Sequence, residues 1–207
     1  MPTPSGDVTI DFTVLANTNP YTPSNFARAT SDTVNLQIIS GTCKPVSPTG
    51  ALTRFMYQGA MDSSKDVISS IEVGVAHVSD NLFMFIGDKT SGQGYMAAVN
   101  STSIGIYTVL ANGTTGGLTS GSVGSITSGD VFAFTWNHTT HNLAVTQNGT
   151  AVINVTDSTY TSGLTFGLGA DGGNTNTSTM LGFGGTGILA SGNVPFMSYG
   201  FQPTVAQ

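Results

Sequence analysis

The segment 130–157, DVFAFTWNHTTHNLAVTQNGTAVINVTD, constrains the fold more than any other part of the chain. The run Val131–Trp136 is β-branched or aromatic at most positions, and the run Thr150–Thr156 alternates between larger and smaller side chains. Between them, Asn148-Gly149 supplies the two residues with positive φ that a type I′ hairpin turn needs. The segment therefore predicts a β-meander.

This turn also predicts a register. With Asn148 and Gly149 at its centre, Gln147 pairs with Thr150 and Thr146 with Ala151. Continuing the same register pairs Val145 with Val152 and Ala144 with Ile153.

Strand-like alternation recurs through the rest of the chain, and no segment has a convincing helical period. We expect strands over 8–14, 34–40, 52–58, 67–78, 81–86, 95–99, 104–110, 164–168, 180–183 and 195–201. We interpret 16–33, 41–50 and 113–129 as connections, the last with at most one short strand. The predicted fold is all-β, an antiparallel two-sheet β-sandwich of the jelly-roll type, with a short arm over 1–6 and a single domain over 7–207.

The composition excludes several classes of partner. Five basic residues face eleven acidic ones, so there is no basic patch for a nucleic-acid backbone. The chain begins MPTPSGDV, without the charged and apolar regions of a signal peptide, and it has no apolar run of 18 residues. We expect a soluble protein that is neither exported by a standard signal nor inserted into a membrane. Cys43 is the single cysteine, so no internal disulfide is available.

Several motifs follow one another in an order that resembles a known family. They are IEVGVAHV, FMFIGD, GYMAAV, GIYTVLANG, TSGD, a QNGT hairpin and TDSTYTSGLTFGLGA. Their order over about residues 66–170 resembles the concanavalin A-like lectin and glucanase sandwich, particularly its laminin-G-like and pentraxin-like branches. The resemblance implies a two-sheet jelly roll that most often binds glycans or proteins and less often hydrolyses glycans.

The glucanases of this family carry their acids on one strand as E-x-D-x-x-E, and this chain departs from that pattern. Glu72 is the only glutamate, and its strand has no second acid. Hydrolysis needs two carboxyl groups about 5 Å apart, or about 6.5–9.5 Å apart in inverting enzymes. Asp66 and Glu72 lie about 20 Å apart along an extended strand. Glycoside hydrolysis is therefore the less favoured function, unless acids of different strands meet.

Two groups of residues have the side chains of metal ligands. His138 and His141 have an H-x-x-H spacing, but they fall in a connection between strands, and the simpler interpretation is two solvated turn residues. Asp171, Asn174 and Asn176 lie in a polar loop, DGGNTNTS, with oxygen ligands at the short spacing that Ca²⁺ uses. The resemblance favours calcium, because laminin-G-like and pentraxin-like modules often carry it in loops.

The candidate glycan-binding residues are Asp88, Tyr95 and Tyr107. Exposed tyrosines stack on sugars, whereas Trp136 shares a strand face with two phenylalanines and is expected in the core. Asp88 has a competing role, the capping of a turn through nearby backbone amides.

Three functions remain. The first is a non-enzymatic structural or adhesion module of a virion, such as a capsid decoration or a tail-fibre component. Its partners would be itself, as a homo-oligomer, other virion proteins and a surface glycan. The second is a free lectin-like carbohydrate-binding protein, and the third is a glycoside hydrolase. The first hypothesis rests on the uncharged Ser, Thr, Asn and Gly surface. It implies that the protein is made in a host cytoplasm and then becomes part of the virion.

Overall fold

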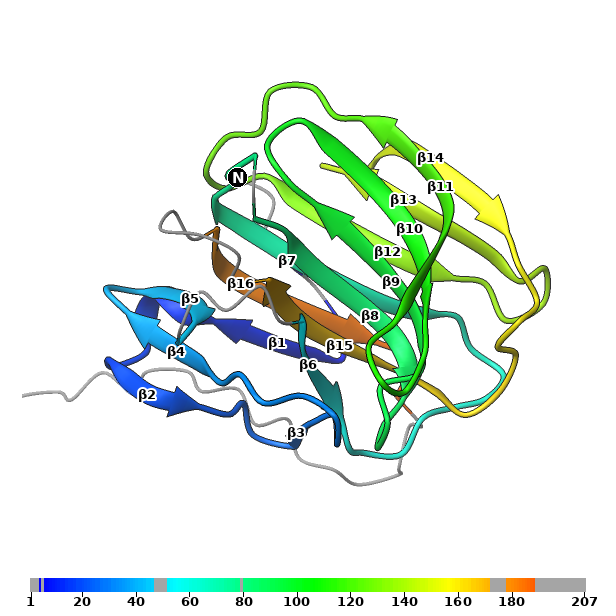
Figure 1. Ribbon diagram of the computed structural model, residues 1–207, viewed down its shortest axis with the longest axis horizontal. Helices are drawn as coiled ribbons and strands as arrows, with labels where there is room; N and C mark the ends of the chain where they lie inside the picture. The colour runs from blue at the N-terminus through cyan, green and yellow to red at the C-terminus, as the bar shows by residue number, and fades with distance from the viewer. Residues whose placement is uncertain (1–3, 5, 47–51, 79, 172–177, 189–207) are drawn as a thin grey trace, which may run out of the picture.

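The computed structural model describes residues 4, 6–46, 52–78, 80–171 and 178–188. Their strands form two antiparallel sheets that stack face to face (Figure 1). One sheet has nine strands within the described ranges, in the order β14 (Thr150–Thr156), β13 (Asn142–Gln147), β12 (Val131–Trp136), β7 (Val67–Val75), β16 (Thr179–Thr186), β5 (Thr42–Pro45), β4 (Leu36–Ile39) and β2 (Thr18–Tyr21), with β1 (Val8–Asp11) also paired to β16.

The other sheet has seven strands within the same ranges. Their order is β11 (Thr115–Ser122), β10 (Ser103–Val109), β9 (Gly94–Val99), β8 (Leu82–Asp88), β15 (Leu164–Asp171), β6 (Leu52–Tyr57) and β3 (Phe26–Arg28). The predicted antiparallel two-sheet β-sandwich is confirmed. No helix in the described ranges is long and apolar enough to cross a membrane.

The main core lies between the sheets, because alternate side chains of each strand point inward. Phe132, Phe134 and Trp136 of β12 are all buried there, as their spacing predicts. The sheets approach closely: the Ser69 hydroxyl on β7 donates to the Gly167 carbonyl on β15, over 2.7 Å. A Cβ at Gly185 would lie 2.3 Å from the Phe166 ring, so only glycine fits there.

The hairpin at Asn148-Gly149 has positive φ at both residues, 50° and 81°, as predicted. Gln147 pairs with Thr150 and Thr146 with Ala151, also as predicted. Beyond these pairs the register is wrong, because an irregularity between Val145 and Thr146 shifts it by one residue. Val145 faces Ile153, and Ala144 faces Asn154.

Other differences concern short strands. The predicted connections 16–33 and 41–50 contain β2, β3 and β5, and 113–129 contains the eight-residue β11. β11 is an edge strand, so it needs little apolar sequence, and Pro45 is tolerated because it ends β5. The strand predicted over 8–14 stops at Asp11, whose carboxylate accepts from the Thr13 amide and starts a 3-10 turn, Phe12–Val14. The strand predicted over 195–201 lies outside the described residues.

Candidate functional site

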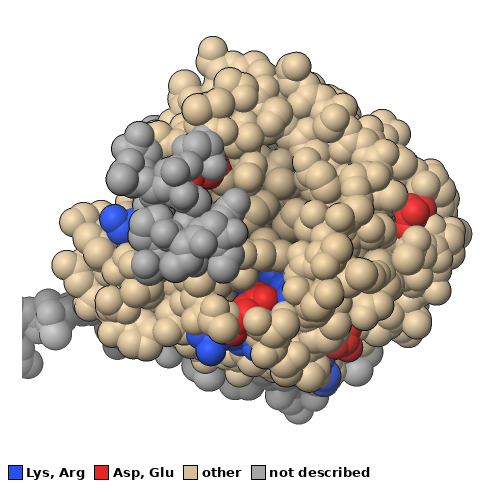
Figure 2. Space-filling model, viewed as in Figure 1, with Lys and Arg blue, Asp and Glu red and all other residues tan. Residues whose placement is uncertain are grey.

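A second apolar cluster lies on the face of the seven-stranded sheet that points away from the core. Phe83 and Phe85 of β8 point to this face, while Leu82, Met84 and Ile86 point into the core. The cluster, here called the outer apolar cluster, consists of Met56, Phe83, Phe85, Met96, Ala98 and Val109, with Leu52 and Tyr107 packed against it. In the view of Figure 2 the molecule shows few charged residues, and its surface is hollowed near the middle.

Arg54 of β6 is fully buried on this same outer face, since it alternates with the core residue Phe55. Its Nη2 lies 2.8 Å from Asp32 Oδ1, and its Nε lies 3.1 Å from Asp32 Oδ2. The same carboxylate accepts from the Arg54 backbone amide over 2.6 Å. Arg54 and Asp32 therefore form a buried ion pair that is joined by several hydrogen bonds.

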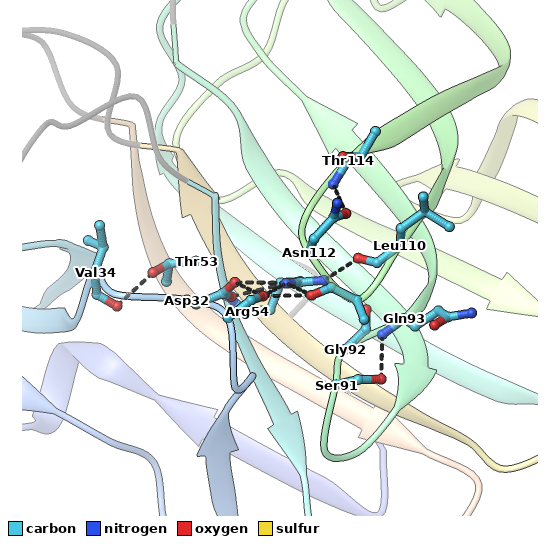
Figure 3. A network of polar contacts seen from close by, with 12 residues as sticks. Asp32, Val34, Thr53, Arg54, Ser91, Gly92, Gln93, Leu110, Asn112 and Thr114 are labelled. Atoms are coloured by element: carbon cyan, nitrogen blue, oxygen red, sulfur yellow. Dashed lines mark hydrogen bonds and ion pairs between the residues drawn. The ribbon is translucent and has the colours of Figure 1, made fainter.

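The remaining donors of Arg54 reach three separate loops (Figure 3). Nη1 donates to the carbonyls of Gly92 and Leu110, over 3.2 and 3.1 Å. Nη2 donates to the Ser31 hydroxyl over 2.7 Å and to the Ala111 carbonyl over 3.1 Å. Every guanidinium nitrogen has at least two acceptors, so this cation fixes loops and has no donor to spare for a ligand.

Asp80 presents the opposite situation. It lies in the turn between β7 and β8 and is fully buried, yet neither carboxylate oxygen has a hydrogen-bond partner in the part of the chain that the structure describes. A buried polar group without a partner costs free energy, and a charged one costs more. An unpaired carboxylate held in a loop is therefore a strong indication of a site completed from outside the protein.

The surroundings of Asp80 are held firmly by three strand ends. The Ser178 hydroxyl, just before β16, donates to the Asp80 carbonyl over 3.0 Å and accepts from the His77 amide over 2.9 Å. In the β9–β10 turn, Asn100 Nδ2 donates to Asn81 Oδ1 over 3.3 Å. We call this region, residues 76–78, 80–81, 100–103 and 178–179, the Asp80 rim.

Asn100 also organises its own turn. Its Oδ1 accepts from the backbone amides of Thr102 and Ser103, over 3.0 and 2.9 Å, and from both of their hydroxyls. The Asn81 and Asn100 side chains are therefore bonded to each other within the rim, whereas the Asp80 carboxylate and the Thr179 hydroxyl have no hydrogen-bond partner among the described residues.

The predicted binding residue Asp88 caps a turn. Its Oδ1 accepts from the amides of Thr90 and Ser91, over 3.1 and 2.8 Å, and from the Ser91 hydroxyl. The Ser91 amide is the main reason that the pKa of Asp88 lies below its ordinary value. Its carboxylate already has partners, so the capping role fits it better than ligand binding.

Tyr95 is only 1% exposed, so it cannot stack on a sugar at the surface. Its hydroxyl donates to Asp157 Oδ1 over 2.8 Å and accepts from the Tyr160 amide over 2.9 Å. Burial first, and then the Asp157 carboxylate, raise the pKa of Tyr95 above its ordinary value. Tyr107, in contrast, is half-buried on the outer face, where its ring lies against Gly105 of its own strand. It is the predicted aromatic that remains accessible.

The metal predictions have separate outcomes. Asn174 and Asn176 lie outside the described residues, as does the side chain of Asp171, so the calcium loop stays a prediction. His138 and His141 make different contacts: His138 Nδ1 lies 3.2 Å from Asp66 Oδ1, and His141 Nδ1 lies 3.0 Å from the Ser158 hydroxyl. Among the described residues no group of three or more His, Cys, Asp or Glu is placed to hold a metal ion.

Glu72 lies beside Gly182 of β16, and Asp11 of β1 pairs with the same glycine from the other side. Burial raises the pKa of Glu72, and the nearby Asp11 adds to this. The Asp11 carboxylate, however, is turned toward Thr13, whose amide it accepts over 2.9 Å. Two acids of different strands thus come near each other, and of the two only Glu72 has no side-chain hydrogen bond to another described residue.

The sequence interpretation missed Asp80. The available signal was its position two residues before the apolar run 82–86, where a strand begins. What singles it out is the lack of a partner for its carboxylate, which only a folded structure reveals.

No protein-family model matches this chain, and no curated protein matches its sequence. The fold does have counterparts among solved structures. The Emp47p carbohydrate recognition domain is 10% identical, with a TM-score of 0.59, covering 86% of this chain and 94% of that one. The chain has a concanavalin A-like β-sandwich fold.

Two further domains give the same result. The VIP36 exoplasmic/lumenal domain in its Ca²⁺/Man3GlcNAc-bound form is 10% identical, with a TM-score of 0.58, covering 85% of this chain and 89% of that one. The metal-free Emp46p carbohydrate recognition domain is 10% identical, with a TM-score of 0.58 and coverage of 80% and 89%. At these identities the likeness establishes the fold alone.

Calcium in the VIP36 structure prompts the question whether the Asp80 rim fits such an ion. Ca²⁺ takes six to eight oxygen ligands, usually including several carboxylates. Of the described rim residues, only Asp80 offers a free carboxylate, while Asn100 Oδ1 is taken by four donors. The described part of the rim therefore does not form a calcium site by itself.

Proposed function

We propose that this protein is a non-enzymatic lectin that binds a glycan at the Asp80 rim. The proposal rests on the carboxylate of Asp80, which is buried and unpaired among the described residues, so that a ligand has to displace the atoms that cover it. Sugar hydroxyls donate hydrogen bonds, and a bond to an ionised acceptor is about twice as strong as one between neutral groups. A glycan hydroxyl would thus give a partner to the carboxyl group of Asp80, which has none among the described residues.

The structural comparisons support the same function, because the similar domains are named for carbohydrate recognition or contain a bound mannose oligosaccharide. They favour the free lectin over the virion module. The virion role and its homo-oligomer find no support in them, and binding without hydrolysis agrees with their lectin character.

The proposal is tested on a glycan array, followed by calorimetry with the glycan that binds best. Asp80→Asn keeps the shape of the side chain and removes its charge. We expect its affinity to fall about 10- to 100-fold, since a hydrogen bond to a charged group contributes about 1.5–3 kcal/mol. Asp11→Asn is the matched control, because it makes the same substitution at the end of β1, outside the Asp80 rim, and keeps an oxygen to cap the 3-10 turn. Equal affinities of Asp80→Asn and wild type would refute the proposed site.

A further inference from the structure

At the opposite end of the sandwich from Asp80 there is a cleft of about 340 Å³. Asp88 ends the strand that begins just after Asp80, which separates the two ends by roughly 26 Å along an extended strand. The cleft lies where β7 and β15 begin and β12 ends, so that Val67, Leu164 and Trp136 line it. A smaller cleft of about 250 Å³ adjoins it and shares Ser162 and Leu164 with it.

Trp136 has an unusual polar environment. The residue is 4% exposed, and its indole Nε1 is buried without a hydrogen-bond partner in the described part of the chain. One face of the ring stacks on His141, with 5.9 Å between centroids and 7° between planes. The indole is therefore packed at the end of β12 on the wall of the cleft, and its buried N–H meets a ligand there once neighbouring side chains move. Buried tryptophan N–H groups usually have a partner, so this one calls for an acceptor.

The cleft walls define what kind of acceptor fits. Met61, Val67 and Leu164 are apolar, and Ser63, Thr161 and Ser162 contribute hydroxyl groups. Lys89 is the cation among the lining residues, and it is solvent-exposed. A ligand that suits these walls has a small apolar group next to a neutral carbonyl oxygen, on a body rich in hydroxyls.

We infer that this cleft is a second saccharide site, selective for an N-acetylated amino sugar whose acetamido carbonyl accepts from the Trp136 indole. The acetamido methyl would pack on the apolar wall, and the sugar hydroxyls would face Ser63, Thr161 and Ser162. The choice of a saccharide rests on the proposed lectin function, whereas the cleft and the unpaired indole do not depend on Asp80.

Trp136 is the single tryptophan of the chain, so its indole N–H gives one isolated resonance in a ¹H–¹⁵N spectrum. We would titrate the protein with N-acetylglucosamine and, separately, with glucose, which has a hydroxyl group in place of the acetamido group. We expect N-acetylglucosamine to move the indole proton downfield in a saturable manner, and glucose to leave it in place. No movement with N-acetylglucosamine, or equal movement with both sugars, would overturn the inference.

Variants separate this site from the first one. Ser162→Phe should fill the shared wall and abolish the indole shift, while Thr159→Phe, an equal change at an exposed position outside the lining, should preserve it. Asp80→Asn should also preserve the shift, so failure of the lectin proposal and failure of this one are distinguishable. An indole shift that persists in Ser162→Phe would contradict the assignment to the cleft.

Trp136→Phe tests the hydrogen bond itself, with binding followed through the amide resonances of Ser162 and Gly163. One net hydrogen bond to a neutral group predicts roughly a 2- to 10-fold weaker affinity. Unchanged affinity would show that the indole N–H does not bind the sugar.

Discussion

Arg54 and Asp80 are both fully buried and both have ionisable side chains, yet their surroundings differ completely. Arg54 has a carboxylate partner and acceptors from three loops for its remaining donors. Asp80 has an anchored backbone and a carboxylate with no partner among the described residues. A buried ionisable group whose hydrogen-bonding atoms all have partners holds the surrounding loops in place. One without partners lowers stability and remains able to bond to a ligand. We therefore assign a structural role to Arg54 and propose a binding role for Asp80.

The largest effect is expected at Arg54. Arg54→Met keeps much of the length of the side chain but leaves Asp32 buried without its cation. Removing one partner of a buried ion pair typically costs about 3–5 kcal/mol. We therefore expect the free energy of unfolding, measured by urea denaturation, to fall by about that amount. A loss below about 1 kcal/mol would show that the Arg54–Asp32 pair contributes no more to stability than a surface ion pair does.

At Asp80 we expect the opposite change in stability. Asp80→Leu replaces the unpaired carboxyl group by an apolar side chain of similar shape, so the same denaturation experiment should show stability raised by about 1–3 kcal/mol, the usual cost of an unsatisfied buried group. The variant would then be more stable and bind less glycan, which is the expected trade-off at a functional site. A destabilisation comparable to that of Arg54→Met would mean that the carboxylate has a structural partner.

Tyr95 lies between these extremes, because it is buried and satisfied but uncharged. Tyr95→Phe removes the hydroxyl that joins Asp157 to the Tyr160 amide. We expect a loss of about 1–3 kcal/mol, because the Tyr160 amide is left without its acceptor. Glycan affinity should stay at the wild-type value, and a loss of binding without a loss of stability would restore Tyr95 as a binding residue.

The smallest effect concerns acid. The pKa of Asp88 is lowered in the folded state, mainly by the Ser91 amide, so its contribution to stability is complete above the unfolded value of about 3.9. That contribution is lost as the pH falls through the folded pKa. Between pH 5 and pH 3 the melting temperature should therefore fall slightly less in Asp88→Asn than in wild type. The two proteins should begin to differ near pH 4. An identical acid response in both proteins would argue against the capping role.

The parts of the fold that the sequence predicts are those set by local chemistry. The Asn148-Gly149 turn and the alternation of Phe132, Phe134 and Trp136 follow from φ preferences and period-two burial. The shifted pairing of Val145 does not, because an irregular pair is chosen by packing across the sheet. For 113–129 the sequence predicts at most one short strand, whereas β11 has eight residues, because its edge position relaxes the demand for apolar side chains.

The candidate site was less accessible to sequence analysis. Tyr95 and Tyr107 are equivalent candidates in the sequence, since both are tyrosines in predicted strands. In the structure Tyr95 is buried and so excluded from sugar stacking, whereas Tyr107 lies half-buried on the outer face. Asp80 and Arg54 stand out only through the partners that they lack or have, and these come from strands far apart in the chain. The structure adds the partners, and so distinguishes a capping acid such as Asp88 from an unpaired one.

The most direct test of the account is to map where the best-binding glycan contacts the protein. In a ¹H–¹⁵N titration, we expect the largest shifts at the amides of Asp80, Asn81, Asn100 and Ser178 and none of comparable size around Arg54. The same titration of Asp80→Asn should require a roughly 10- to 100-fold higher glycan concentration. Shifts confined to regions outside the Asp80 rim, with unchanged affinity in Asp80→Asn, would contradict the central claim.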